Sequence, residues 1–302
     1  MKNNLSDKNE NKDRKGRGVS HSKIILMGEH SVVYGYPAIA IPLKNIRMEC
    51  IVERATVPFV HNKKDTLSTA IYTALNYLNR KNENIKYKVM SDIPPKRGMG
   101  SSAAVSIAAI RGVLDYFNTE VDNLTLEKLV NEAEIIAHNT PSGLDAKTCL
   151  SDSAIKFIKN KGFKNLEMNL GAYLLIADTG IHGHTRDAIM NIKNMGDRAL
   201  PMLEKLGKLT EETEKFIEEK DVINIGKNMI SAHGELKKLG VSIKKSDVLV
   251  KTAIDEGAYG AKMSGGGLGG CIIALMESRE KAEMTGKKLM EKGAVNIWIE
   301  AL

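Results

Sequence analysis

Several features that would place this chain in a specialised class of protein are missing from it. Its 302 residues contain no run of about 18 apolar residues, which excludes a membrane-spanning helix from the predicted fold. The N-terminal residues are polar and lack the apolar segment of a secretory signal. The three cysteines, Cys50, Cys149 and Cys271, stand far apart and form no Cys-x-x-Cys pair, which excludes a structural zinc site. We therefore expect a reducing, cytoplasmic location and no membrane partner.

Aromatic residues and an excess of one charge are also scarce. Phe, Trp and Tyr make up 5% of the chain, and 44 basic residues stand against 37 acidic ones, a net charge of +7. Residues 2–17 hold six basic and three acidic side chains, so this polar segment alone supplies +3 of the excess. The remaining charge is too small to indicate a nucleic-acid-binding face, and the few aromatic residues weaken a base-stacking interpretation. We expect no nucleic acid partner, whereas small anionic substrates stay compatible with the charge.

The chain otherwise has an ordinary globular composition, with 42% hydrophobic and 27% charged residues. Residues 1–18 are rich in Asn, Lys and Asp, which predicts a disordered N-terminal extension. Beyond it, alternating or short apolar stretches predict strands, and apolar residues three and four apart predict helices. The predicted strands are 23–27, 46–52, 85–89, 172–177, 271–276 and 295–300; the predicted helices are 67–78, 101–117, 125–138 and 279–292, with three more between 185 and 256.

These strands and helices do not alternate strictly, so the pattern favours an α+β, two-layer design over a doubly wound parallel sheet. The length suggests two domains. We place the N-terminal domain at 19–170 and the C-terminal domain at 171–302.

The segment Arg97–Ala104, RGMGSSAA, opens the predicted buried helix 101–117. Its glycines allow several backbone amides to point at one spot, and Ser101 and Ser102 are good N-cap residues. Because a helix N-terminus with free amides attracts anions, phosphate is the natural ligand. A plain capped helix after a tight turn is the alternative.

A second glycine-rich segment, Ser264–Gly270, leads directly into the predicted strand 271–276. This composition indicates close approach of the backbone to a ligand, because a linker would not be followed at once by an apolar strand. Gly98, Gly100 and Ala103 match the dinucleotide pattern G-x-G-x-x-A, and the second segment contains G-x-G-x-x-G, but the surroundings of both disfavour a dinucleotide site. Pro94 and Pro95 interrupt the approach to the first segment, and the second precedes a strand instead of a helix.

Charged residues also stand in apolar surroundings. Lys23 is at the head of the predicted strand 23–27, and Glu29 and His30 follow its end, where solvated strand ends are the alternative. Glu134 borders the apolar face of its predicted helix, and a carboxylate there needs a cation or hydrogen-bond donors. Asp145 ends the predicted turn PSGLD, where a helix N-cap is the alternative.

Five motifs together resemble the GHMP kinase family and occur in the order typical of it. They are HSKIILMGEHSVVYG (21–35), PPKRGMGSSAA (94–104), PSGLD (141–145), ADTGIHGHTR (177–186) and KMSGGGLGG (262–270). The resemblance covers about residues 19–302. Within the family, the segment GEHSVVYG resembles that of the short bacterial members that act on mevalonate. Galactokinases have a segment similar to GEHTDY at this place.

The resemblance implies a two-domain fold, with an N-terminal domain like ribosomal protein S5 domain 2, a ferredoxin-like C-terminal domain and the active site in the cleft between them. It implies ATP-dependent phosphorylation of (R)-mevalonate to (R)-5-phosphomevalonate in isoprenoid biosynthesis, with ATP and Mg²⁺ as cofactors. Mevalonate and ATP are the implied partners, and a homodimer is compatible with the resemblance because relatives are often dimers.

The same resemblance implies a role for individual residues. Asp145 is the implied proton acceptor, Lys23 is implied to lie beside it and the nucleophilic oxygen, and Ser102 and Glu134 are implied to hold Mg²⁺. The residues implied to contact ATP are Lys96, Arg97, Gly98, Met99, Gly100, Ser101, Ser102, Ala103, Gly266 and Gly267. Those implied to contact mevalonate are Lys23, Glu29, His30, Ser142, Asp145 and Thr185.

Two alternatives stay open at this point. One is a sibling enzyme of the family, such as phosphomevalonate kinase or the decarboxylase that acts on the diphosphate. The other is a non-catalytic small-molecule sensor on the same fold, which can lose the catalytic base. Lys23, Glu134 and Asp145 are all present here, which favours an enzyme.

Overall fold

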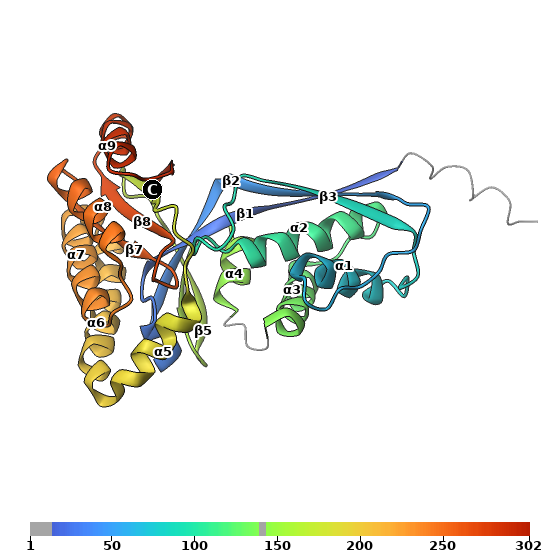
Figure 1. The fold of residues 1–302 in the computed structure, drawn as a ribbon, viewed down its shortest axis with the longest axis horizontal. Helices are drawn as coiled ribbons and strands as arrows, with labels where there is room; N and C mark the ends of the chain where they lie inside the picture. The colour runs from blue at the N-terminus through green and yellow to red at the C-terminus, as the bar shows by residue number, and fades with distance from the viewer. Residues whose placement is uncertain (1–13, 139–142) are drawn as a thin grey trace, which may run out of the picture. The chain divides into compact units, whose positions relative to one another are not determined.

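The computed structural model describes residues 14–138 and 143–302, which divide into two compact units (Figure 1). Unit 1 consists of the chain up to Ser22, Lys44–Ile93 and Gly100–Leu150, and unit 2 of Lys23–Leu43, Pro94–Met99 and Ser151–Leu302. The units are interleaved in sequence, so the segments 23–43 and 94–99 belong with the C-terminal half. The proposed domain division at residue 170 follows the order of the chain and stays a prediction.

In unit 1, four helices lie on one side of the strands, as Figure 1 shows. These strands are β1 (Lys15–Met27), β2 (Ala38–Arg54) and β3 (Ile85–Ser91). Strands β2 and β3 pair antiparallel, from Met48 opposite Ser91 to Arg54 opposite Ile85. The predicted alternation is confirmed, because Ile46, Met48, Cys50 and Val52 are all buried. The helices are α1 (Thr66–Tyr77), α2 (Ser101–Tyr116), α3 (Asn123–His138) and α4 (Leu144–Leu150).

Helix α2 is buried over most of its surface because it is built from small and aliphatic residues, as the sequence predicted. Strand β1 lies against it through two glycines. A Cβ atom on Gly16 would overlap with the carbonyl oxygen of Gly112, and one on Gly18 with that of Ala108. Residues 15–18 are therefore part of β1, and the prediction that they belong to a disordered extension is wrong. Residues 1–13 lie outside the described residues.

Unit 2 contains two groups of strands. Ala38–Ala40 of β2 pair with β4 (Ala154–Ile158), which pairs with β5 (Gly162–Leu166). A four-stranded antiparallel sheet has the order β7-β8-β6-β9. Its strands are β6 (Tyr173–Asp178), β7 (Gly260–Ser264), β8 (Cys271–Met276) and β9 (Asn296–Ala301).

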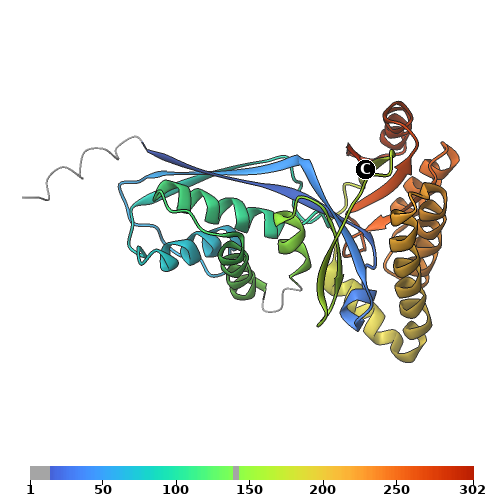
Figure 2. The same cartoon turned by 180° about the vertical axis from the view of Figure 1, so that it is seen from behind.

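Four helices, where three were predicted, connect β6 to β7: α5 (Thr185–Met195), α6 (Leu200–Glu218), α7 (Val222–Lys238) and α8 (Lys244–Asp255). Helix α9 (Arg279–Glu291) connects β8 to β9, and the 3₁₀ turns η1 (Ser31–Tyr34) and η2 (Gly196–Ala199) complete the unit. Figure 2 shows α6 and α7 side by side, in agreement with their contacts. The order strand, helices, two strands, helix, strand is that of the ferredoxin-like βαββαβ unit.

The apolar core of unit 2 joins one face of the four-stranded sheet to α8 and α9. Its buried residues include Leu175, Leu249, Ile272, Met276 and Leu289. Burial of such side chains is the main source of stability for this layer. The α+β class predicted from the sequence is therefore confirmed.

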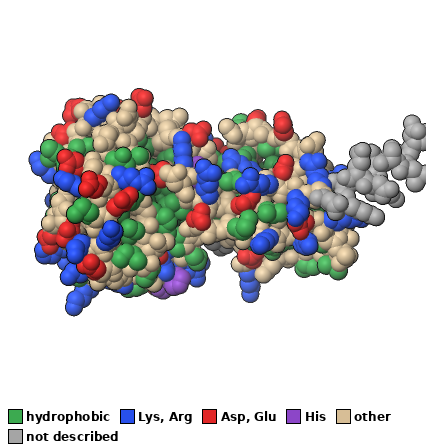
Figure 3. Space-filling model, turned by 90° about the horizontal axis from the view of Figure 1, so that it is seen from above, with side chains coloured by type: hydrophobic (Ala, Val, Ile, Leu, Met, Phe, Trp, Pro, Cys, Tyr) green, Lys and Arg blue, Asp and Glu red, His purple; other side chains and the backbone are tan. Residues whose placement is uncertain are grey.

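Three further properties agree with the composition. Cys50, Cys149 and Cys271 are buried and form no disulfide. Among the described residues, every helix is too short or too polar to cross a membrane. Figure 3 shows acidic and basic side chains interspersed on the visible face of each unit.

The contact of Gly18 with α2 generates a prediction about stability. We expect Gly18→Ala to destabilise the protein by about 1–3 kcal/mol, because the added methyl group must displace the Ala108 carbonyl. Urea unfolding measures the change. Gly234→Ala is the control, since Gly234 lies in α7 with nothing within 4 Å of an added Cβ, and it should be neutral or stabilising by up to about 1 kcal/mol. Equal stability of the two variants would contradict the role of Gly18.

Candidate active site

The N-terminus of α2 in unit 1 lacks the capping side chain that the sequence predicted. The N-cap residue is Gly100, with φ of 72°, and no side chain caps the helix. The prediction that Ser101 and Ser102 serve as N-caps is wrong, because both lie inside the helix. A glycine in the left-handed conformation reverses the chain without adding a side chain. The first-turn amides of α2 therefore receive no hydrogen bond from a capping side chain.

The hydroxyl groups near this end of α2 bind a buried carboxylate instead. Ser102 Oγ donates to Glu134 Oε1 at 2.9 Å, and Ser106 Oγ donates to the same oxygen at 3.2 Å. The two serines are four residues apart and so lie on one face of α2. Glu134 comes from α3 and is 8% exposed. The structure thus brings together the two residues predicted to hold a metal.

Asp145 lies in the first turn of α4 and is half-buried. The turn predicted for residues 141–145 is therefore wrong at its end, where Leu144 and Asp145 are helical. Helix α4 packs against α2 and α3 within unit 1. Ser142, predicted to contact mevalonate, lies outside the described residues.

Lys23 is in unit 2, in the interior of β1 and not at the head of a strand. Its side chain is 2% exposed. Lys23 Nζ donates to the carbonyl of Gly98 at 3.3 Å, and its backbone amide donates to the carbonyl of Met99 at 3.2 Å. The predicted catalytic lysine and two residues of the predicted phosphate-binding turn are therefore neighbours.

The glycines of 264–270 bring further predicted residues to this turn. A Cβ on Gly98 would lie 3.1 Å from the carbonyl oxygen of Ser264, and one on Gly265 would lie 2.8 Å from Gly98 Cα. A Cβ on Gly266 would overlap with Thr185 Oγ1, and one on Gly270 would lie 2.9 Å from the carbonyl oxygen of Arg97. The absent side chains allow backbone segments to approach one another, a structural requirement that the sequence interpretation attributed to a ligand.

Arg97 anchors the turn 94–99 to the end of β6. Its Nε lies 2.7 Å from Asp178 Oδ1, and its Nη2 donates to the carbonyl of Gly180 at 3.2 Å. The side chains of this ion pair are 12% and 4% exposed. Arg97 Nη1 is buried and finds no acceptor among the described residues. Lys96, next to it, is exposed and has a positive φ of 58°.

The turn after β1 contains two buried polar residues, so the alternative of solvated strand ends is excluded for both. Glu29 is 1% exposed and forms an ion pair with Lys262, whose side chain is fully buried. His30 is 7% exposed and adopts a positive φ of 61°, unusual for a residue with a side chain. Burial, with a smaller effect of the Lys262 charge, lowers the pKa of His30 to about 4, so this imidazole is neutral near pH 7.

Three residues of these contacts were missed by the sequence analysis: Ser106, Asp178 and Lys262. Asp178 stands in the quoted motif ADTGIHGHTR and Lys262 in KMSGGGLGG, yet neither motif indicates a partner for them. Thr185 begins α5, and His182 and His184, which precede it, are exposed loop residues. No group of three or more His, Cys, Asp or Glu side chains suited to a metal occurs in the described part of the chain.

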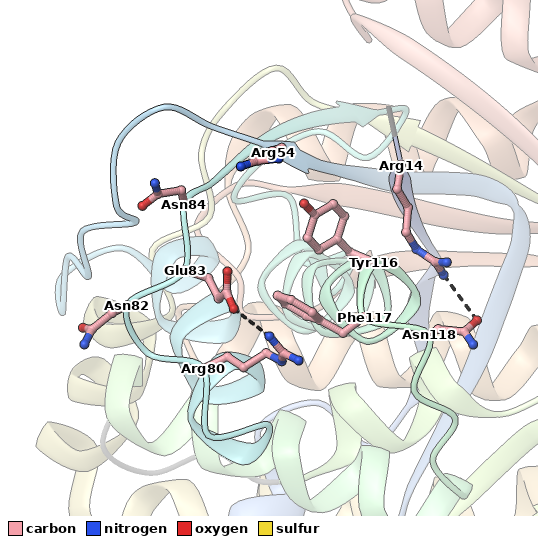
Figure 4. A pocket seen from close by; sticks show the side chains of 9 residues that line it. All are labelled: Arg14, Arg54, Arg80, Asn82, Glu83, Asn84, Tyr116, Phe117 and Asn118. Atoms are coloured by element: carbon pink, nitrogen blue, oxygen red, sulfur yellow. Dashed lines mark hydrogen bonds and ion pairs between the residues drawn. The ribbon is translucent and has the colours of Figure 1, made fainter. Parts of the chain in front are cut away.

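A pocket of about 420 Å³ lies at the other end of α2, in unit 1 (Figure 4). It contains arginines, but two of them have protein partners. Arg14 Nη2 donates to the carbonyl of Asp115 at the C-terminus of α2, and Arg80 pairs with Glu83 and lies over the Phe117 ring. Cations at a helix C-terminus offset its partial negative charge, which gives this pocket a structural explanation.

Comparisons with known proteins identify the family to which this chain belongs. Residues 68–152 match the family described as GHMP kinases N terminal domain, and residues 213–293 match GHMP kinases C terminal. A mevalonate kinase of Pyrococcus furiosus is 32% identical, covering 89% of this chain and 91% of that protein. The chain therefore belongs to the GHMP kinase family.

Within that family, the solved structures similar to this chain include mevalonate kinases. The crystal structure of mevalonate kinase from methicillin-resistant Staphylococcus aureus MRSA252 is 29% identical, with a TM-score of 0.78 over 96% of this chain and 99% of that one. The structure of L. major mevalonate kinase in complex with R-mevalonate, at 24% identity, shares the fold with a TM-score of 0.86 over 97% and 98%.

The neutral, buried His30 generates a prediction about acid stability. Because its folded pKa is about 4 and its ordinary value is 6.5, the unfolded chain binds more protons between these pH values, and stability is lost as pH falls through this window. Between pH 7 and pH 4.5 we expect wild type to lose about 2–3 kcal/mol more than His30→Gln does. Urea unfolding at both pH values measures the difference.

His184→Gln is the control for this experiment, because the His184 side chain is 57% exposed. It should lose as much stability as wild type does on acidification. If His30→Gln behaves like wild type, the neutral state assigned to His30 is wrong.

Proposed function

We propose that this chain transfers the γ-phosphoryl group of ATP to the 5-hydroxyl of (R)-mevalonate and releases (R)-5-phosphomevalonate and ADP. The observation that carries the proposal is the 32% identity to a mevalonate kinase over nearly the whole of both chains. The reaction belongs to the mevalonate pathway of isoprenoid biosynthesis. Phosphoryl transfer depends mainly on positioning and on neutralisation of negative charge, and the described residues supply groups for both.

ATP binds through its phosphates to the turn and helix start that contain Lys96, Arg97, Gly98, Met99, Gly100, Ser101, Ser102 and Ala103. Two features support this assignment: the uncapped first turn of α2 and the unpaired Nη1 of Arg97. Backbone amides at a helix N-terminus are suited to phosphate oxygens. Gly266 and Gly267 contribute backbone from the second glycine-rich segment.

Mg²⁺ fits the oxygen pair formed by Ser102 and Glu134. The hydroxyl and the carboxylate already lie 2.9 Å apart, and both are the hard oxygen ligands that this ion prefers. Mg²⁺ usually takes one or two protein oxygens and completes its shell with phosphates and water, so two side chains suffice. When bound, the ion neutralises phosphate charge. Ser102 and Glu134 would then supply the two protein oxygens of its shell.

The acceptor hydroxyl is activated by Asp145 and Lys23. A primary alcohol is a poor nucleophile near neutral pH, and a carboxylate that accepts its proton removes this limitation. An ammonium group next to the oxygen stabilises the negative charge that develops on it. Lys23 is held by the Gly98 carbonyl and is almost completely buried, which limits the number of positions that its ammonium group can take.

Mevalonate is held by polar groups that the fold leaves without partners. Glu29 Oε2 and His30 Nε2 are buried and form no hydrogen bond among the described residues. Buried atoms of this kind usually have a partner, and a substrate hydroxyl or carboxylate is one. Thr185 and Ser142 complete the proposed substrate contacts. Besides these small molecules, a homodimer, a cytoplasmic location and the absence of nucleic acid or membrane partners stay predictions.

The test of the function is ADP release with a panel of acceptors. We expect rapid ADP release with ATP, Mg²⁺ and (R)-mevalonate, and little with 5-phosphomevalonate, the diphosphate, galactose or homoserine. Preference for a phosphorylated mevalonate would support a sibling enzyme of the family instead. No turnover with any acceptor, together with tight binding of one, would support a sensor.

The role of Asp145 predicts a loss of chemistry without a loss of nucleotide binding. We expect Asp145→Asn to lower kcat by about 10²–10⁴, because the amide cannot accept the proton. Calorimetric titration with ATP should give a Kd within about threefold of wild type. Asp255→Asn is the control, since Asp255 is an exposed partner of Lys251 in α8. Near-normal turnover of Asp145→Asn would remove Asp145 from the chemistry.

The role of Glu134 predicts a change in the metal requirement. We expect Glu134→Gln to raise the Mg²⁺ concentration for half-maximal activity by about tenfold or more, because a charged oxygen ligand is lost. Glu132→Gln, on the exposed side of the same helix, should titrate as wild type does. An unchanged titration of Glu134→Gln would rule out the ligand role.

A further inference from the structure

The proposed chemistry leaves one fully buried cation unexplained. Lys262 lies in the middle of β7, its side chain is 0% exposed, and it is the largest completely buried side chain among the described residues. Its Nζ donates to Glu29 Oε1 and, at 2.8 Å, to the carbonyl of Met263. The partner carboxylate is 1% exposed. The pair therefore has no access to water that would stabilise either charge.

Such a pair is an inefficient way to stabilise a strand. Removing two charges from water costs several kcal/mol per ion, and attraction between them offsets this only when the geometry is good. Burial raises the pKa of Glu29 against the opposing charge of Lys262, and burial lowers the pKa of Lys262. All five residues of β7 are buried, so two aliphatic side chains in place of both Lys262 and Glu29 would fit the surroundings without this penalty.

Two buried polar atoms near the Glu29–Lys262 ion pair have no hydrogen-bond partner among the described residues. Lys262 occupies Glu29 Oε1 and leaves Oε2 unpaired, and His30 Nε2 next in sequence is unpaired as well. His30 also adopts its strained backbone conformation at this point. Strain and unpaired buried polar atoms concentrate where a protein binds a ligand. Lys262 thus fixes one oxygen of Glu29 while the other stays available.

The charged groups around the pair come from three elements. Lys23 in β1 lowers the pKa of Glu29, although less than Lys262 does. The positive charge of Lys262 lowers the pKa of His30. On the other side, His233 of α7 accepts a hydrogen bond from the Met263 amide and lies 3.2 Å from Asp247 of α8. Lys262 is therefore held between an acidic neighbour and two imidazoles whose protonation its charge opposes.

We infer that Lys262 is a positioning residue for substrate binding: it orients the Glu29 carboxylate and places a positive charge near His30, so that Glu29 Oε2 and His30 Nε2 are presented to mevalonate. The inference rests on the proposed function for the identity of the ligand. It assigns to Lys262 a role that acts through its two neighbours and not through contact with the reacting atoms. A purely structural pair would affect stability alone.

The first arm of the test is kinetic. We expect Lys262→Met to raise KM for mevalonate by about tenfold or more, because Glu29 loses the partner that orients it, and to leave KM for ATP within about twofold. Lys156→Met is the matched control: Lys156 forms an ion pair with Glu214 in the same unit, with side chains 15% and 14% exposed. Its two KM values should equal those of wild type.

The second arm follows the His30 imidazole by NMR, assigned with His30→Gln, and needs no activity. In wild type and Lys156→Met, His30 should not titrate between pH 5 and pH 8. In Lys262→Met the lost positive charge and the uncompensated Glu29 carboxylate both favour the imidazolium, so the His30 pKa should rise into this range. If Lys262→Met does not fold, Lys262→Gln, which keeps a donor without the charge, is used for both arms.

The outcomes separate the inference from the function. If wild type shows no turnover of mevalonate, the proposed function fails, and the His30 titration still decides the role of Lys262. If wild type phosphorylates mevalonate, but the folded Lys262 variant keeps both its KM for mevalonate and the low His30 pKa, the inference is overturned. A selective rise in KM for mevalonate together with the titration of His30 supports it.

Discussion

Approach of backbone to backbone without intervening side chains is the constraint on which the rest of unit 2 depends. Gly98 and Gly265 allow the turn 94–99 to lie against the start of the second glycine-rich segment. Only with the turn in this place does the Gly98 carbonyl reach the ammonium group of Lys23. A Cβ at either glycine would push these two segments apart and would move the Gly98 carbonyl away from Lys23. The glycines thus position the side chain proposed to be catalytic although they carry none themselves.

Three cations of unit 2 that belong to the candidate site are held by specific partners and are not left to solvent. Arg97 binds Asp178, Lys262 binds Glu29, and Lys23 donates to a backbone carbonyl. Buried ions interact more strongly than exposed ones because less water screens them, but each needs a fixed partner. The proposed transfer from a triphosphate to a carboxylate substrate would gain from cations whose positions are set before the ligands arrive.

Local patterns of the chain were good predictors of local burial. The alternation over 46–52 and the small residues of α2 identified a half-buried strand and a buried helix, and Glu134 was correctly placed at the edge of an apolar face. These inferences depend only on the period of a strand or helix, which a short segment contains in full. The resemblance to a family then supplied roles for the residues in these elements.

What could not be predicted depends on partners far away in the sequence. Glu29 and Lys262 are 233 residues apart, and nothing in the motif around either residue indicates the other. The start of β1 was missed for a related reason. Residues 15–18 are stabilised by glycine contact with α2, and a pattern search that counts apolar side chains cannot detect an interaction made possible by their absence. Ser102 was predicted to be a helix cap because its local sequence does not indicate that its hydroxyl donates to Glu134, 32 residues away.

The bond between Ser264 and β1 has a consequence for biosynthesis. Ser264 Oγ both accepts from the amide of Ile25 and donates to its carbonyl, across 239 residues of sequence. A ribosome releases the N-terminal strand long before it makes the hydroxyl that secures this strand. Strand β1 therefore stays without its Ser264 contact, and the Glu29 carboxylate stays hydrated, until most of the polypeptide has emerged. A chain that ends before residue 262 would lack both Lys262 and Ser264 and could form neither contact.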